Sequence, residues 1–162
     1  MTHGFDDQGR QFAANGNLMD WWSKEDAENF KSRADKLAAQ YSDYTVLDTL
    51  HLNGRLTLGE NLADLGGLSI AYEAFTKTKE FKDGKSIDGF TPTQRFFLSW
   101  AQVWRSNTTP ETQAQLVLTD PHSPGMYRAN GAVVNMDPWY AAFNVKPGDK
   151  MYKAPADRLH IW

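Results

Sequence analysis

The sequence predicts a mainly α-helical domain, for three reasons. Apolar residues recur at helical spacing in several stretches, and no stretch shows the convincing alternation of apolar and polar residues that half-buried strands show. Prolines and capping residues stand where several of these stretches begin. The length of 162 residues, with 41% apolar and 23% charged residues, fits one globular domain with a buried core.

The first two helices are expected in the N-terminal half. One covers residues 21–41, with Asp20 as its N-cap and an apolar stripe along one side. Residues 42–53 look irregular. The second and longest helix is expected over residues 57–80, although it contains the pair Gly66-Gly67. Since each glycine weakens a helix, the pair indicates a closely packed neighbour.

Shorter helices follow in the second half. Thr91-Pro92-Thr93 opens one with proline near its first turn, and apolar residues on more than one of its faces indicate deep burial up to Trp104. Pro110 opens the next helix, which runs to about Leu118, and residues 138–143 form the last. Between them, the Pro- and Gly-rich stretch 119–125 is expected to be a loop.

Composition excludes several classes of function. Without cysteine, the chain has no disulfides, thiolate metal sites or cysteine nucleophile. The net charge of −3 gives no electrostatic footprint for nucleic acid. There is no apolar run of about 18 residues that could cross a membrane, and no export signal follows Met1.

Two carboxylates on the longest predicted helix are candidates for chemistry. Glu60 and Asp64 are four residues apart, so they lie on one helix face among apolar neighbours. Two acids there repel each other unless a cation meets them. One interpretation is a solvated face. The other is a metal site, in which one carboxylate is a ligand and the other orients a histidine ligand.

A histidine near the N-terminus has a similar pattern. His3 and Asp7 are four residues apart, so on a helix the carboxylate could receive the second ring nitrogen of the histidine. Such a contact fixes the tautomer of a metal ligand. The alternative is a frayed N-terminus with an exposed histidine.

Several strings in this sequence, taken in order, resemble the C-terminal part of neprilysin-like zinc metallopeptidases, the M13 family. The resemblance covers the chain from Met1 to Trp162. It is carried by Thr2-His3-Gly4-Phe5-Asp6-Asp7, His51-Leu52-Asn53-Gly54, Gly59-Glu60-Asn61-Leu62-Ala63-Asp64-Leu65-Gly66-Gly67, Phe97 through Trp104, His122-Ser123-Pro124-Gly125 and the terminal Trp162.

The resemblance implies a fold and a zinc site. Residues 1–162 would be the helical C-terminal part of a thermolysin-like (zincin) catalytic domain of a zinc metalloendopeptidase. In the family a His-Glu-x-x-His helix and a later Glu-x-x-x-Asp helix build the site. By this resemblance His3 is the second histidine and a zinc ligand, and Glu60 is the third protein ligand. Asp64 is the acid that orients the first histidine.

The resemblance also implies groups that act on substrate. His122 corresponds to the histidine that hydrogen-bonds the developing oxyanion. Arg128 corresponds to the arginine that grips the substrate backbone, and Trp104 lines the pocket for the side chain after the scissile bond. The expected partners are a peptide substrate and the upstream part of the same protein. Members of the family usually act outside the cytoplasm, as periplasmic, secreted or membrane-anchored enzymes.

The first half of the His-Glu-x-x-His zinc motif is not found in this sequence. The first histidine and the glutamate general base of His-Glu-x-x-His would precede Met1. We therefore expect the isolated chain to bind zinc weakly or not at all and to be inactive. The alternatives are a non-catalytic module that keeps His122, Arg128 and Trp104 to bind peptides, and an aromatic-rich structural domain without a ligand.

Overall fold

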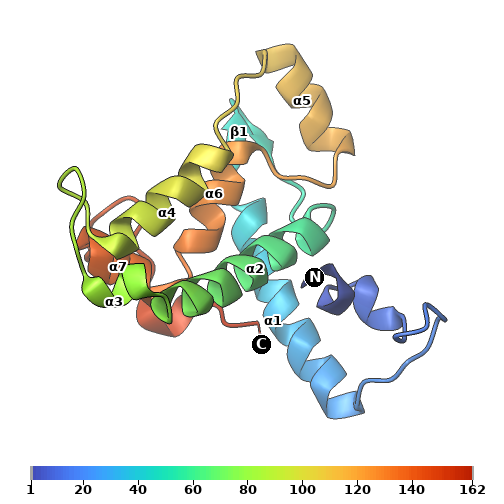
Figure 1. The fold of residues 1–162 in the computed structure, drawn as a ribbon. Helices are drawn as coiled ribbons and strands as arrows, with labels where there is room; N and C mark the ends of the chain where they lie inside the picture. The colour runs from blue at the N-terminus through green and yellow to red at the C-terminus, as the bar shows by residue number, and fades with distance from the viewer. Residues whose placement is uncertain (1, 162) are drawn as a thin grey trace.

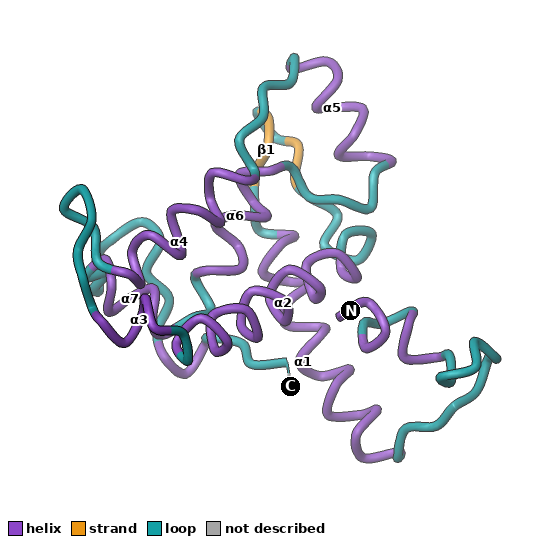
Figure 2. Tube along the Cα trace, in the orientation of Figure 1, coloured by secondary structure: helices purple, strands orange, loops and turns teal. Residues whose placement is uncertain are grey.

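Helices supply nearly all the regular structure of residues 2–161, the part of the chain that the computed structural model describes (Figures 1 and 2). The mainly α prediction is therefore confirmed. The α-helices are α1 (Lys24–Ser42), α2 (Leu58–Thr76), α3 (Lys79–Asp83), α4 (Pro92–Val103), α5 (Pro110–Thr119), α6 (Gly125–Val133) and α7 (Asp137–Phe143). The 3₁₀ helices are η1 (Thr2–Phe5), η2 (Gly9–Gln11) and η3 (Pro155–Asp157).

A small hairpin occupies part of the stretch that the sequence analysis described as irregular. Strand β1 (Thr45–Leu47) pairs antiparallel with β2 (Leu50–His51), with Leu47 opposite Leu50 and a bulge between Thr45 and Leu47. Strands this short leave almost no alternating pattern in a sequence, which is why periodicity did not reveal them.

Helix α2 is the central element, and it is covered on several sides. It packs against η1, α1 and α6 (Figure 1). Its buried leucines belong to the hydrophobic core together with residues of α1 and α6. Since neighbours surround its first half, α2 also buries two polar side chains there, Asn61 and Asp64.

Two predicted helix boundaries were wrong, each because a hydroxyl side chain caps a helix. The N-cap of α1 is Ser23, whose Oγ accepts a hydrogen bond from the backbone N–H of Asp26, so Asp20 lies before the helix. The long helix ends at Thr76 instead of residue 80. Thr78 then caps α3 by accepting a hydrogen bond from the backbone N–H of Phe81.

Helix α4 begins as predicted but is less buried than predicted. Thr91 and Gln94 form a capping box at its start. Phe97 is 3% exposed, whereas Leu98 and Val103 are 40% and 69% exposed. The physical reason is position: α4 lies beside α6 and α7, and aromatic rings of α2 cover only part of its surface.

The close neighbour predicted for the glycine pair of α2 is absent at Gly67, where a Cβ would only touch Thr2 at an ordinary 3.7 Å. Gly66 is buried. A tight contact lies between α6 and α1, where a Cβ on Gly131 would overlap the ring and hydroxyl of Tyr41. Glycine is therefore required at position 131 for these two helices to pack.

Large apolar side chains remain exposed over much of the surface. They cluster near η1 and η2, on the outer side of α4 and around α5: Phe5, Phe12, Leu18, Met19, Trp21, Ile70, Ile87, Phe90, Leu98, Val103, Leu116, Leu118 and Met126. Among the described helices, none combines the length and the apolar character that a membrane crossing needs. Trp162, the last residue that carries the family resemblance, lies outside the described residues.

Candidate functional site

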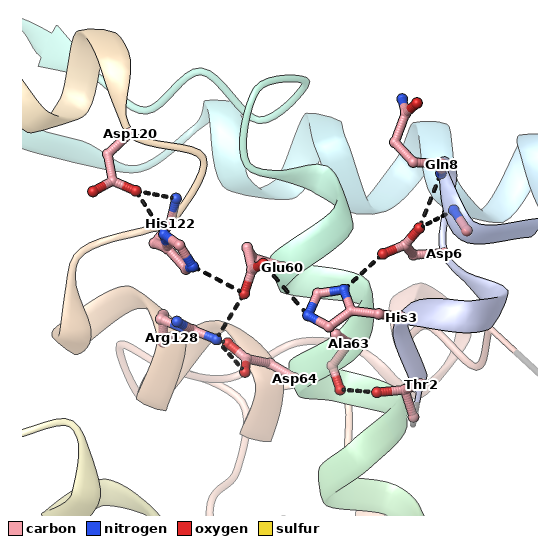
Figure 3. A network of polar contacts seen from close by, with 11 residues as sticks. Thr2, His3, Asp6, Gln8, Glu60, Ala63, Asp64, Asp120, His122 and Arg128 are labelled. Atoms are coloured by element: carbon pink, nitrogen blue, oxygen red, sulfur yellow. Dashed lines mark hydrogen bonds and ion pairs between the residues drawn. The ribbon is translucent and has the colours of Figure 1, made fainter.

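The predicted acid pair of α2 does lie on one helix face, and its cationic partner is an arginine of α6. Arg128 Nε donates to Asp64 Oδ2 at 2.7 Å, and its Nη2 donates to Asp64 Oδ1 at 2.8 Å (Figure 3). The same Nη2 lies 3.2 Å from Glu60 Oε2. This bidentate arrangement is the strong form of an arginine–carboxylate pair.

Burial sets the electrostatics of this pair. Only 7% of the Asp64 side chain and 13% of the Arg128 side chain are exposed. Burial raises the pKa of Asp64, and the adjacent guanidinium opposes that rise. Burial also works against the charged form of Arg128, but the bonds to Asp64 outweigh it and raise the pKa of Arg128. Trp104 completes the surroundings, because the guanidinium carbon of Arg128 lies 4.0 Å from the centre of its ring.

His3 reaches α2 because η1 packs against this helix. The hydroxyl of Thr2 donates to the carbonyl of Ala63 at 3.2 Å, which ties η1 to α2 one turn below Glu60. His3 Nε2 then lies 3.4 Å from Glu60 Oε1 (Figure 3).

The carboxylate that holds His3 is Asp6, not Asp7, so the predicted partner was wrong. His3 Nδ1 lies 2.7 Å from Asp6 Oδ2. The segment is a 3₁₀ helix, in which residues three apart are aligned, whereas the prediction assumed the four-residue spacing of an α-helix. Asp6 is 5% exposed and also accepts the backbone N–H groups of Gln8 and Gly9, so its orientation is fixed.

These contacts suit a metal ligand. An ionised carboxylate only accepts hydrogen bonds, so Asp6 places the proton of a neutral His3 on Nδ1 and leaves the lone pair of Nε2 directed at Glu60. Two donor atoms held at zinc–ligand distance by one tetrahedral ion are about 3.4 Å apart. His3 Nε2 and Glu60 Oε1 have this separation. Within residues 2–161, no group of three or more His, Cys, Asp or Glu side chains is arranged to hold a metal ion.

His122 approaches Glu60 from the opposite side. Its Nε2 lies 3.4 Å from Glu60 Oε2, and its Nδ1 lies 2.7 Å from Asp120 Oδ1. Asp120 also accepts the backbone N–H of His122 at 2.8 Å, and this bond, with that of the ring, lowers the pKa of Asp120. Glu60 thus lies between two histidines, each held by an aspartate.

The six residues singled out from the sequence come together around the first half of α2: His3, Glu60, Asp64, Trp104, His122 and Arg128. Sequence reasoning missed Asp6 and Asp120, although a histidine two or three residues from an acid was a signal for both. It also expected Asp64 to orient a histidine. In residues 2–161 its two oxygens instead accept hydrogen bonds from Arg128.

Comparison with known proteins gives one consistent family. The pattern described as Peptidase family M13 matches residues 1–159. Neprilysin-3 of Drosophila melanogaster is 41% identical over 166 residues, which cover 100% of this chain and 21% of that protein. Endothelin-converting enzyme 1 of Homo sapiens is 41% identical over 165 residues, with the same coverage.

Solved structures agree with the sequence relatives. The zinc metalloprotease ZMP1 of Mycobacterium tuberculosis, in complex with an inhibitor, matches with a TM-score of 0.91 and 39% identity, over 99% of this chain and 25% of that one. PEPO from Lactobacillus rhamnosis HN001 matches with a TM-score of 0.85 and 33% identity, over 98% and 24%.

All these matches cover only part of the length of the matched protein. The chain spans about a fifth of the length of the curated relatives that it matches and about a quarter of the two solved chains. The region matched by the family pattern includes His3, Glu60 and His122, the residues that the fold brings together. The chain therefore belongs to peptidase family M13.

Proposed function

We propose that residues 1–162 act as the C-terminal part of the catalytic domain of a zinc-dependent metalloendopeptidase. The observation that carries the proposal is the position of Glu60, which has His3 Nε2 and His122 Nε2 at 3.4 Å on its two oxygens and Arg128 beside it. Three segments far apart in the chain supply these groups. In a member of family M13, this cluster supports peptide hydrolysis.

His3 and Glu60 are the residues of this chain that would hold the zinc ion. Bound zinc supplies a Lewis acid and a water of lowered pKa. Asp6 keeps the ring of His3 turned towards Glu60, so the two ligands are oriented before any metal arrives. A catalytic zinc site keeps three protein ligands, and the resemblance assigns the first to a histidine upstream of Met1.

His122 would stabilise the oxyanion that forms when a peptide carbonyl is attacked. Its Nδ1 faces Asp120, which the lowered pKa keeps ionised. Asp120 orients the ring of His122, whose Nε2 is directed at the site beside Glu60. A preorganised donor aimed at a developing negative charge is an effective electrostatic catalyst.

Arg128 and Trp104 would bind the peptide. Within residues 2–161, the bonds of Arg128 to the acids use Nε and Nη2, which leaves Nη1 to donate to a substrate carbonyl in this proposal. Asp64 and Trp104 hold the guanidinium from two sides, which fixes the direction of that donor. In this proposal Asp64 supports substrate binding through Arg128.

The second candidate is a non-catalytic peptide-binding module. It is favoured by one feature: His122, Arg128 and Trp104 are in place, whereas the printed chain contains no His-Glu-x-x-His motif. This candidate requires peptide binding by residues 1–162 without turnover.

The test compares two proteins on a quenched-fluorescence peptide library. One is the chain of residues 1–162, and the other also carries the segment encoded immediately upstream of it. We expect chelator-sensitive hydrolysis only by the longer protein, because the isolated chain lacks a general base, which is worth about 10²–10⁴-fold. In the longer protein, His122→Ala should lower mainly kcat, and Arg128→Ala should mainly raise KM.

Two results would contradict this proposal. Turnover by residues 1–162 alone would mean that another residue acts as the base. No turnover by the longer protein, together with peptide binding that Arg128→Ala abolishes, would favour the binding module.

A further inference from the structure

A chain of buried hydrogen bonds lies directly behind the candidate site. Ser123 Oγ donates to Asn61 Oδ1 at 2.9 Å, and Asn61 Nδ2 donates to Thr57 Oγ1 at 2.9 Å. Thr57 Oγ1 then donates to the carbonyl of Asn53 at 3.2 Å. Ser123, Asn61 and Thr57 are 3%, 0% and 1% exposed. The four groups thus form a one-directional chain from the loop before α6, across α2, to the loop before α2.

The chemistry of this chain fixes its geometry. With Oδ1 of Asn61 towards Ser123, the Thr57 hydroxyl accepts from the amide and keeps its proton for the carbonyl of Asn53. In the flipped orientation Thr57 would have to donate to the amide and give up its bond to Asn53. A buried amide with an unpaired oxygen is costly, so the loop carrying Ser123 has one favourable position on α2. An apolar contact would tolerate sliding, whereas this contact does not.

These hydrogen bonds are linked to the site because two of the bonded residues are sequence neighbours of site residues. Asn61 follows Glu60 on α2, and Ser123 follows His122. The side chain of His122 is half exposed, and its Nδ1 is held by Asp120 of the same loop. The position of His122 relative to Glu60 therefore depends on what ties this loop to α2.

One hydrogen bond of the described residues ties the segment 105–124 to α2, while α5 within the segment packs against β1 and buries Val117. Residues 105–124 form an excursion that connects α4 to α6. Helix α5 lies within this excursion and stands apart from α1 and α2 (Figure 1). Within the described residues, the bond from Ser123 to Asn61 is the one hydrogen bond that joins this excursion to α2. The ion pair between His122 and Glu60 is the contact that it would position.

We propose that Ser123, Asn61 and Thr57 are positioning residues that set the distance between His122 and Glu60. The inference rests on the proposed function for its catalytic consequence, because His122 is there the oxyanion donor. None of the three touches substrate; they act through the loop that carries His122.

The kinetic test uses the longer protein that carries the upstream-encoded segment. Ser123→Ala should lower kcat by about 10–100-fold, as expected for a catalytic group displaced by about 1 Å, and should leave KM within about 2-fold. In a His122→Ala background the same substitution should change kcat by less than about 2-fold, because the group that it positions is gone. An equal loss in both backgrounds would overturn the proposal.

Two further variants guard against a purely structural effect. Ser42→Ala is the matched control, because the Ser42 hydroxyl also joins distant segments, donating to Ala38 and accepting from the N–H of Gly54, but far from His122. It should leave kcat unchanged. Thr57→Val is nearly isosteric and frees the Asn61 amide, so it should lower kcat in the same direction as Ser123→Ala, by less. A kcat loss from Ser42→Ala as large as that from Ser123→Ala would contradict the proposal.

A structural measurement on residues 1–162 separates this inference from the proposed function. Nuclear Overhauser contacts between the ring of His122 and the side chain of Glu60 should disappear in Ser123→Ala, while those between Arg128 and Trp104 persist. Unchanged contacts of His122 would overturn the positioning role, whether or not the longer protein hydrolyses peptides. Absence of hydrolysis by the unsubstituted longer protein would contradict the proposed function alone.

Discussion

Arg128 shows how one residue resolves a conflict that the sequence leaves open. Glu60 and Asp64 place two carboxylates on the first half of α2, where most residues are buried, and a cation must meet them. The guanidinium binds Asp64 with both Nε and Nη2 and also reaches Glu60. The residue that supplies the charge is 64 positions away from Asp64, so spacing along α2 could not identify it.

Removing this guanidinium should destabilise the fold. We expect Arg128→Met to cost about 3–5 kcal/mol in the free energy of unfolding, because it leaves the buried carboxylate of Asp64 unpaired. The double variant Arg128→Met with Asp64→Leu should recover most of that loss. Urea unfolding of both variants measures the difference. A loss below about 1 kcal/mol for the single variant would show that Asp64 is solvated.

A second prediction follows from the partner of His3. In the longer protein that carries the upstream-encoded segment, Asp6→Asn should weaken zinc binding by about 10–100-fold, since a carboxylate that orients a histidine ligand is typically worth that much. Asp7→Asn is the matched control and should have little effect, because its carboxylate faces Gln8. Competition with a chromophoric chelator measures both affinities. The reverse order would restore the four-residue pairing that the sequence suggested.

The local sequence predicts the conformation of α2 better than it predicts the conformation of the segment before α1. For α2, the local sequence predicts the longest helix over residues 57–80, and a helix is present from Leu58 to Thr76. For Thr2–Phe5, only the choice between a 3₁₀ helix and an α-helix decides whether Asp6 or Asp7 faces His3. That choice depends on packing against α2, which a local pattern does not contain.

The same reasoning explains what was predictable in the site. The identities of its six residues came from the family resemblance, and five of them, all but Arg128, lie in the strings that carry it. Their mutual geometry came from contacts across 60 or more positions, such as Ser123 with Asn61 and Arg128 with Asp64. Side chains such as Asp120, which act by holding another side chain, are visible only once that geometry is known.

Helix packing at Gly131 can be tested against a glycine with room to spare. Gly131→Ala should cost about 1–3 kcal/mol, because the new methyl group would overlap Tyr41, which is fully buried and cannot move aside. Gly67→Ala should be neutral or stabilising by up to about 1 kcal/mol, because the helix gains propensity without a clash. Thermal unfolding of the two variants checks the contrast. Equal effects would contradict the packing of α6 on α1.

At the scale of the whole molecule, hydrogen bonds hold the C-terminal segment against α1 and the end of α6. The ammonium group of Lys153 donates to Gln40 Oε1 of α1 at 2.6 Å and to Asn135 Oδ1, just after α6, at 3.0 Å. Burial lowers the pKa of Lys153, and the nearby charge of Asp157 opposes that effect only in part. A cation held by neutral amides thus joins the last segment to the core.

This lysine should make stability depend on pH in a defined direction. Its pKa is lower in the folded state than in the unfolded chain, where it is near 10.4, so the unfolded state binds the proton more readily. Stability should therefore rise as the pH increases through the folded-state pKa towards about 10.4, and should level off at its lower value below the folded-state pKa. Comparing denaturant unfolding of the wild type with Lys153→Met isolates the effect. A difference that is constant across alkaline pH would mean that the group is solvated.

The excursion of residues 105–124 has a further consequence, for how the chain can be modified. Its two ends meet, since a Cβ on Gly125 would overlap the carbonyl oxygen of Trp104. A loop whose ends are already joined changes length at little entropic cost, about 0.6 kcal/mol per doubling. The exposed residues Ser106 to Thr109 are therefore suited to carry an inserted epitope or a small reporter domain, while the motif beginning at His122 keeps its place.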